Sequence, residues 1–455
     1  MTDDSTERAT ASLVSRWQTV RQLQPWMRLF SGDFALKGYL SAVDQGLISI
    51  TNFLASVFLA RLVSPQQFGV YAVGFLLLHL VRALQEGLVV QPMSSIGAVM
   101  DQPTFRRYAS NVAIIQLALA VGLSMVAATG GCLLTVMGND VAGPTLFSLW
   151  FVFLTWQPQE FIRRIFYTRG ALPSAILNTA VSSVVRLSAL WLFAQQQTAL
   201  SGQAGLHAIA WGSLAASILG FWQARRYWVL HGLNPLQAGL RNWKFGRWVL
   251  GATVANWFTL EIYPILTAGL ISFAAAGAYR ALQTVVAPVH VLLRAIDTLL
   301  TPRIAMLYHQ TGHRGLGRAL RLTYLVAGVP ILGLLVMVSL FPAPILQLLY
   351  GDTYLEFHQG LALVAIFYGL WFAYWPLQTA FKAIHLTLPI FIANMAAIVS
   401  MFTIGLWAIH RWGLYGTIGG QALNAFIVGL VLWISWVVVV RREREANSKS
   451  QPATR

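Results

Sequence analysis

Ionisable side chains within the long apolar stretches of this chain are the residues best placed to do chemistry. A charge inside an apolar segment is costly unless it faces water or a partner. The forked N–H donors of arginine fit phosphate oxygens, and a carboxylate in the same surroundings can take up and release a proton. We single out eight such residues: Asp44, Arg82, Glu86, Arg186, Glu261, Arg280, Arg294 and Asp297. They predict a wet interior in which arginines bind an anion and carboxylates exchange ions.

Some of these charges could instead neutralise one another. Arg82 and Glu86 are four residues apart, and Arg294 and Asp297 are three apart. Both spacings bring side chains together on one face of a helix. Asp44 could likewise be a buried partner of Arg82, so a structural role stays open for these five residues.

Arg186 and Glu261 have no oppositely charged neighbour at helical spacing, which favours a functional role for both. Arg280 lies close to the predicted outer end of its span, where its side chain could extend to the lipid headgroups. His79 and His290 also fall within apolar stretches, where a single histidine is more often part of the core.

The elements that must position these charges are transmembrane helices. Of 455 residues, 57% are hydrophobic and 10% are charged, whereas soluble domains are about 25% charged. A helix satisfies its own backbone polar groups in lipid, and about 20 apolar residues cross the hydrocarbon. We therefore predict an all-α integral membrane protein with about 12 transmembrane helices. The predicted spans are residues 38–60, 69–91, 110–137, 145–162, 173–193, 206–224, 247–270, 275–300, 322–341, 359–381, 389–409 and 415–440.

The basic residues lie almost entirely on one side of these spans. On the opposite side only Arg61 and Arg411 occur, whereas the first-side loops and both tails hold most of the 31 Lys and Arg residues. This asymmetry predicts an even number of spans, with both termini in the cytoplasm. It also explains the net charge of +16 without a nucleic acid partner.

The charge distribution divides the chain into five parts. Residues 1–37 have apolar positions at helical spacing with arginines between them, which predicts an amphipathic cytoplasmic helix; a partly disordered tail is the alternative. Two six-helix lobes follow at 38–224 and 247–440, joined by a basic linker at 225–246 and followed by a basic tail at 441–455.

The chain repeats itself at an offset of 208 residues. Residues 60–71 (ARLVSPQQFGVY) align without gaps with residues 268–279 (AGLISFAAAGAY). Each segment joins the first two spans of a predicted lobe. Because six is an even number, the two lobes enter the membrane in the same direction, as do the parallel repeats that surround a central path in some transporters.

The first hairpin resembles a known family. Residues 44–49 (DQGLIS), 52–53 (NF) and 59–71 (LARLVSPQQFGVY) are similar to the hairpin of the O-antigen and exopolysaccharide flippases (Wzx-type). Those proteins belong to the multidrug/oligosaccharidyl-lipid/polysaccharide (MOP) superfamily. Residues 278–307 resemble the eighth span of the same family.

The resemblance implies a two-lobed transporter with a cationic central cavity. It implies that undecaprenyl-pyrophosphate-linked oligosaccharide is moved across the bacterial inner membrane, for O-antigen, exopolysaccharide or capsule synthesis. On that reading the four arginines bind the pyrophosphate and the four carboxylates couple transport to an ion gradient. A polysaccharide polymerase and a chain-length regulator would be the protein partners, besides membrane lipids.

Two other functions remain open. A polysaccharide polymerase or ligase would need a catalytic face, and usually has a long outer loop, whereas the longest outer loop here is residues 342–358. A drug or cation antiporter of the same superfamily would need an acidic cavity, and four arginines against four carboxylates do not decide this. Cys132 is the only cysteine and no GxxxxGK[ST] motif occurs, so we expect no catalytic residue, metal or cofactor.

Overall fold

The computed structural model describes residues 33–196, 200–384 and 386–450, and these segments are helical throughout apart from their short connections. Most of the predicted N-terminal amphipathic segment, together with residues 451–455, lies outside the described residues. Among the described helices, eight stretches are long and apolar enough to cross a membrane. The predicted all-α membrane fold is confirmed.

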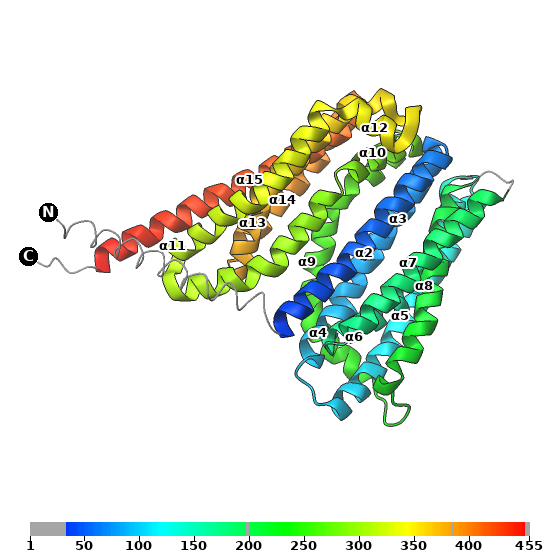
Figure 1. Cartoon of the computed structure of the whole chain (residues 1–455), viewed down its shortest axis with the longest axis horizontal. Coiled ribbons are helices and arrows are strands. Elements are labelled where there is room, and N and C mark those ends of the chain that lie inside the picture. The colour runs from blue at the N-terminus through cyan, green and yellow to red at the C-terminus, as the bar shows by residue number, and fades with distance from the viewer. Residues whose placement is uncertain (1–32, 197–199, 385, 451–455) are drawn as a thin grey trace, which may run out of the picture.

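The helices form two bundles that lie side by side (Figure 1). The first bundle, here the N-terminal lobe, contains α2 (Asp33–Leu62), α3 (Pro65–Gln85), η1 (Glu86–Val90), α4 (Gln91–Gly97), α5 (Gln102–Val136), α6 (Ala142–Thr168), α7 (Leu172–Gln195), α8 (Gly202–Gln223) and η2 (Ala224–Tyr227). The C-terminal lobe contains α9 (Pro235–Leu270), α10 (Phe273–Val285), α11 (Pro288–Leu340), α12 (Pro342–Tyr350), η3 (Gly351–Phe357), α13 (His358–Ala383), α14 (Leu388–Ser400), η4 (Met401–Gly405) and α15 (Leu406–Ser450).

Two long helices each extend over parts of two predicted spans. At about 1.5 Å per residue, α11 would be far longer than a bilayer is thick, and Figure 1 shows that it doubles back at the lower left. It includes the second half of the eighth span, the predicted loop and almost all of the ninth span, whereas α10 holds the first half of the eighth. In α15 the backbone breaks at Gly413, with φ 56° and ψ −128°, within the predicted turn between the eleventh and twelfth spans.

The sides of the helices are apolar where they face away from the bundle. On α5 the polar side chains of Gln116 and Ser124 are buried, at 1% and 5% exposure, whereas Leu117 and Met125 are 55% and 64% exposed. This is the reverse of a soluble helix. It fits a helix that turns its apolar side to lipid and its polar side to protein.

The repeated segments meet each other where α2 runs into α3, at the end that the charge distribution predicts to be the outer one. A Cβ atom at Gly69 would overlap the backbone of Phe273, and a Cβ at Gly277 would overlap the backbone of Pro65. Both pairs follow the 208-residue offset, so each repeat contributes the same glycine to the same contact. Arg61 adds a second contact there, since its guanidinium donates to two backbone carbonyls of α12.

Helix α9 contacts both lobes. Its first half packs on the N-terminal lobe, where Tyr108 donates a 2.6 Å hydrogen bond to Asn242 and Gly246 lies against η1. Its second half packs on α15, with the hydroxyls of Thr267 and Thr417 2.8 Å apart. The helix begins at Pro235, so the second half of the predicted linker is helical. The predicted domain boundaries themselves stay a prediction.

Candidate functional site

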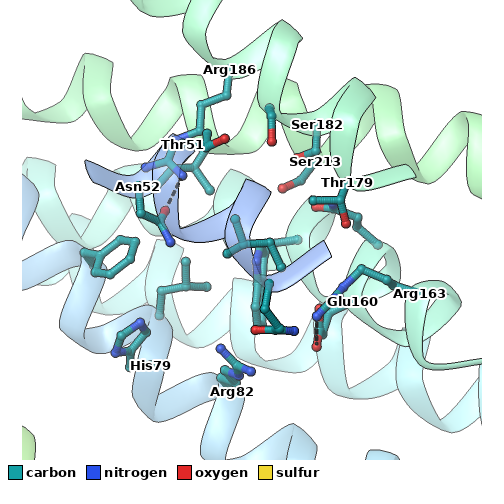
Figure 2. Close-up of a pocket in the computed structure, with 18 residues that line it drawn as sticks. Thr51, Asn52, His79, Arg82, Glu160, Arg163, Thr179, Ser182, Arg186 and Ser213 are labelled. Atoms are coloured by element: carbon teal, nitrogen blue, oxygen red, sulfur yellow. Dashed lines mark hydrogen bonds and ion pairs between the residues drawn. The ribbon is translucent and has the colours of Figure 1, made fainter. Parts of the chain in front are cut away.

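A polar cavity of about 110 Å³ lies within the N-terminal lobe, between α2, α3, α6, α7 and α8. Most of its lining residues come from the interior of these helices and not from their ends. Basic side chains and neutral hydroxyl or amide groups dominate the wall (Figure 2). The basic lining residues are His79, Arg82, Arg163 and Arg186, and the neutral polar ones include Thr51, Asn52, Thr179, Ser182, Ser183 and Ser213.

Arg186 is fixed in the cavity wall by residues of the first hairpin. Its guanidinium donates to Asn52 Oδ1 at 2.7 Å and to the hydroxyl of Tyr71 at 2.9 Å. The dashed line in Figure 2 marks the bond to Asn52. The side chain is buried, and its Nε has no hydrogen-bond partner within the described part of the chain. Arg186 is therefore an oriented cation with donor capacity left over.

A buried ion-pair network closes one end of the cavity. Arg163 donates to Asp44 Oδ2 at 2.5 Å and to both carboxylate oxygens of Glu160 at 2.9 Å. The hydroxyl of Tyr167 donates to the same Asp44 oxygen at 2.6 Å. Asp44 is fully buried and Arg163 is 3% exposed. Charges removed from water in this way require close partners, and here both carboxylates have one.

The network extends to η1 and α4. Arg164 donates to Glu160 Oε1 at 2.8 Å and lies 3.9 Å from Glu86 Oε2. Glu86 also accepts a 3.0 Å hydrogen bond from Gln91. Glu86 therefore pairs with a residue of α6, a partner that the spacing of Arg82 and Glu86 did not indicate.

Sequence reasoning missed Glu160 and Arg163. It ended the fourth span at residue 162 and assigned Arg163 and Arg164 to a cytoplasmic loop, whereas α6 continues to Thr168. Glu160 lies inside that predicted span and was overlooked. The spacing of Glu160 to Arg163 and Arg164, three and four residues, was the available signal, because it is the spacing of paired charges on a helix.

Glu261 lies at the boundary between the lobes. Its Oε1 is 3.6 Å from Nδ1 of His79, and each side chain is 31% exposed. Arg280 reaches the same region from α10, with its guanidinium 4.9 Å from the ring centre of Phe75. Because Phe75 and His79 both line the cavity, this second group of charges adjoins the first.

The predicted site residues thus fall into three groups. Arg82 and Arg186 line the cavity, Asp44 and Glu86 belong to the buried network, and Glu261 and Arg280 lie between the lobes. The side chains of Arg294 and Asp297 lie outside the described residues. The roles of all eight in binding and ion coupling stay predictions.

Solved structures of similar fold are membrane transporters. An inward-facing multidrug-resistance MATE transporter of the MOP superfamily matches with a TM-score of 0.71 at 14% identity, over 89% of this chain and 96% of that chain. An outward-facing MATE transporter matches with a TM-score of 0.63 at 14% identity, over 90% and 95%. A MOP superfamily transporter from Pyrococcus furiosus, described as having a binding pocket of reverse polarity, matches with a TM-score of 0.62 at 16% identity, over 91% and 95%.

These likenesses show the fold: two lobes of helices, as the sequence predicted. No curated protein matches the chain in a sequence comparison. A family model described as "Polysaccharide biosynthesis protein" matches residues 58–359, a segment that contains the outer contact between the repeats and most of the cavity wall. This multi-pass membrane protein, which has the fold of the MOP transporters, belongs to that polysaccharide biosynthesis family.

Proposed function

We propose that this protein is a flippase that moves a polyprenyl-pyrophosphate-linked oligosaccharide across the bacterial inner membrane. The observation that carries the proposal is the polar cavity between the helices of the N-terminal lobe, with Arg186 oriented in its wall and its Nε unpaired within the described chain. A cationic, hydroxyl-lined cavity suits a substrate that joins an anionic head to sugars. The family match supports the saccharide part of the proposal.

Different chemical groups of the cavity suit different parts of the substrate. Guanidinium groups stabilise the pyrophosphate, because arginine offers paired donors to phosphate oxygens. The neutral hydroxyl and amide groups beside them suit the sugar hydroxyls, with which they exchange hydrogen bonds. The polyprenyl chain stays in the lipid, since its transfer from hydrocarbon into a polar cavity is unfavourable.

Transport then requires the cavity to open to one membrane face at a time. The lobes are in close contact at the predicted outer end, through the two glycines and Arg61. We assign this arrangement to a state that is closed to the outside and receives substrate from the cytoplasmic leaflet. Asp44, Glu86, Glu261 and Asp297 are the candidates for coupling this exchange to an ion gradient, and both termini face the cytoplasm in the proposed orientation.

Drug or cation antiport is the second candidate function. The fold of the MATE transporters favours it. The cavity chemistry argues against it, because four basic side chains and a single carboxylate, Glu160, line the wall within the described residues. An enzyme such as a polymerase or ligase has weaker support, since the solved proteins of this fold are transporters.

A cell-based experiment tests the proposal. Deleting the gene is expected to abolish surface polysaccharide and to leave lipid-linked repeat units in the cytoplasmic leaflet. Adding back the wild-type gene is expected to restore export. Export at the wild-type level together with a loss of drug resistance would instead establish the antiporter. Deletion of a gene for a membrane transporter of unrelated fold serves as the control for general membrane damage.

A further inference from the structure

One carboxylate and one histidine connect the two lobes. Glu261 is on α9 in the C-terminal lobe and His79 is on α3 in the N-terminal lobe, with 3.6 Å between Oε1 and Nδ1. Both side chains are partly accessible. Because the partners belong to different lobes, this contact exists only while the lobes hold their present positions.

Several basic groups surround this one acid. Arg82 on α3 and Arg280 on α10 act electrostatically on His79, and Arg280 and His290 on α11 act on Glu261. Arg280 lies across the boundary, above the ring of Phe75. Its Nε is buried and has no hydrogen-bond partner among the described residues.

Two tyrosine hydroxyls complete the surroundings of Glu261, those of Tyr279 on α10 and Tyr368 on α13. Tyr368 is hydrogen-bonded to His290, with 2.7 Å between the oxygen and Nε2. Neither tyrosine carries a charge in its ordinary state. Within the described chain, Glu261 is therefore surrounded by the guanidinium of Arg280, two histidines and two neutral hydroxyls.

This group of charges is continuous with the cavity. Phe75, His79 and Arg82 belong to the cavity wall, and His79 is at the same time the partner of Glu261. Asp44 and Glu160 are both bound by Arg163, and Arg82 also acts electrostatically on Glu160, so neither carboxylate belongs to the group at the lobe boundary. Among the described residues, Glu261 is thus the carboxylate that faces His79 and Arg280 when the cavity holds no substrate.

We propose that Glu261 is a built-in competitor of the anionic substrate. It occupies the place of a phosphate group beside His79 and Arg280 in the empty protein, and a phosphate-bearing ligand displaces it from them. This inference rests on the proposed function and adds the event that connects substrate binding to movement. A pyrophosphate brings more charge and more acceptor oxygens than one carboxylate, so it wins the exchange.

The exchange has a mechanical consequence. When the ligand takes the basic groups, the contact between Glu261 and His79 is lost, and with it one of the contacts that hold the lobes together. A ligand moves a conformational equilibrium only through interactions that differ between the two states. Here the difference is the replacement of an inter-lobe contact by contacts to the ligand.

Binding of inorganic pyrophosphate to the purified full-length protein in detergent, measured by calorimetry at neutral pH, tests the inference. Glu261→Gln keeps the size of the side chain and removes its charge. We expect it to bind pyrophosphate on the order of tenfold more tightly than the wild type, because a repulsive charge near the anion is gone. Arg280→Gln is expected to weaken binding by a similar factor, and Glu356→Gln, on the exposed outer connection, is expected to match the wild type.

The outcomes separate this inference from the proposed function. Unchanged or weaker binding in Glu261→Gln, with binding lost in Arg186→Gln, would overturn the competitor role and leave the anion-binding cavity in place. An absence of pyrophosphate binding in both the wild type and Glu261→Gln would overturn both. Melting temperatures of all variants within a few degrees of the wild type show that the proteins compared are folded.

Discussion

Arg186 is held in place by two neutral partners, Asn52 and Tyr71, and not by a carboxylate. Its positive charge is therefore available to a ligand, while its position is fixed before the ligand arrives. Preorganised charge of this kind loses little side-chain entropy on binding. Arg163, in contrast, lies between Asp44 and Glu160, and its charge is balanced within the protein. Both arginines line the same cavity, yet only the first has charge to offer.

Replacing Arg186 tests this distinction in cells. Arg186→Ala is expected to reduce polysaccharide export at least about tenfold, because hydrogen bonds to a charged group contribute about 1.5–3 kcal/mol. The measurement is surface polymer per unit of membrane-inserted protein. Arg411→Ala, on the opposite side from most basic residues, is the matched control and should export normally. Wild-type export by Arg186→Ala would remove this residue from the site.

Replacing Arg163 should affect stability first. Arg163→Ala leaves two buried carboxylates without their shared partner, which costs about 3–5 kcal/mol. We expect a clearly lower apparent melting temperature in detergent. Asp44→Asn should lower it less, since Arg163 keeps Glu160. The double variant Asp44→Asn with Arg163→Ala should lose less stability than the sum of the two single losses; strict additivity would show that the two residues do not act as a pair.

The sequence identified Asp44 as a buried charge but not its partner. Arg163 is 119 residues away along the chain, and no periodicity within one helix reports a contact between two helices. The same limit applies to Glu261 and His79, which meet only because the lobes do. The type of each charged residue and its place within an apolar stretch were predictable. Its partner was not, because pairing depends on which helices become neighbours.

At the scale of the helices, the contact between the repeats determines how closely the lobes approach. Gly69 and Gly277 each face backbone atoms of the other repeat. Small residues allow such close packing in lipid, where the hydrophobic effect between helices is absent. Each glycine also lies four residues after the residue whose backbone the other one meets, Pro65 or Phe273. The contact between the two helices therefore extends over about one helical turn on each of them.

Substituting these glycines should separate the lobes at the outer end. We expect Gly69→Ala and Gly277→Ala each to slow export and lower the melting temperature, because the added Cβ overlaps a backbone atom. Gly269→Ala, whose Cβ would meet nothing within 4 Å, should behave as the wild type. The double variant should be little worse than either single one, since both disturb the same contact. Fully additive effects would indicate two independent sites.

Helix boundaries show how far the sequence alone could reach. The lengths of the apolar stretches identified the spans. The predicted turn before residue 415 coincides with the backbone break at Gly413. The inner ends were less well predicted: α6 and α9 extend beyond the apolar stretches into the basic segments. A helix that leaves the hydrocarbon has no reason to stop there, because its polar residues can be covered by neighbouring helices, as Arg163 is.

At the scale of the whole molecule, the close contact of the lobes at the predicted outer end predicts from which side the cavity can be reached. In a Cys132→Ser background, Ser183→Cys places a single thiol in the cavity wall. A membrane-impermeant maleimide should label it in inside-out vesicles and not in intact cells. Cys132 of the unmodified protein, exposed near the end of α5, should show the opposite preference. Equal labelling of Ser183→Cys from both sides would contradict the proposed state.

The reciprocal glycine contact has a consequence for the origin of the chain. A two-fold contact uses one surface twice, so a single sequence satisfies both of its sides. A half-length ancestor carrying that glycine would have formed the contact with a second copy of itself before the two copies were joined. Since then each half has been free to diverge, and today the oriented arginine belongs to one half and the competing carboxylate to the other.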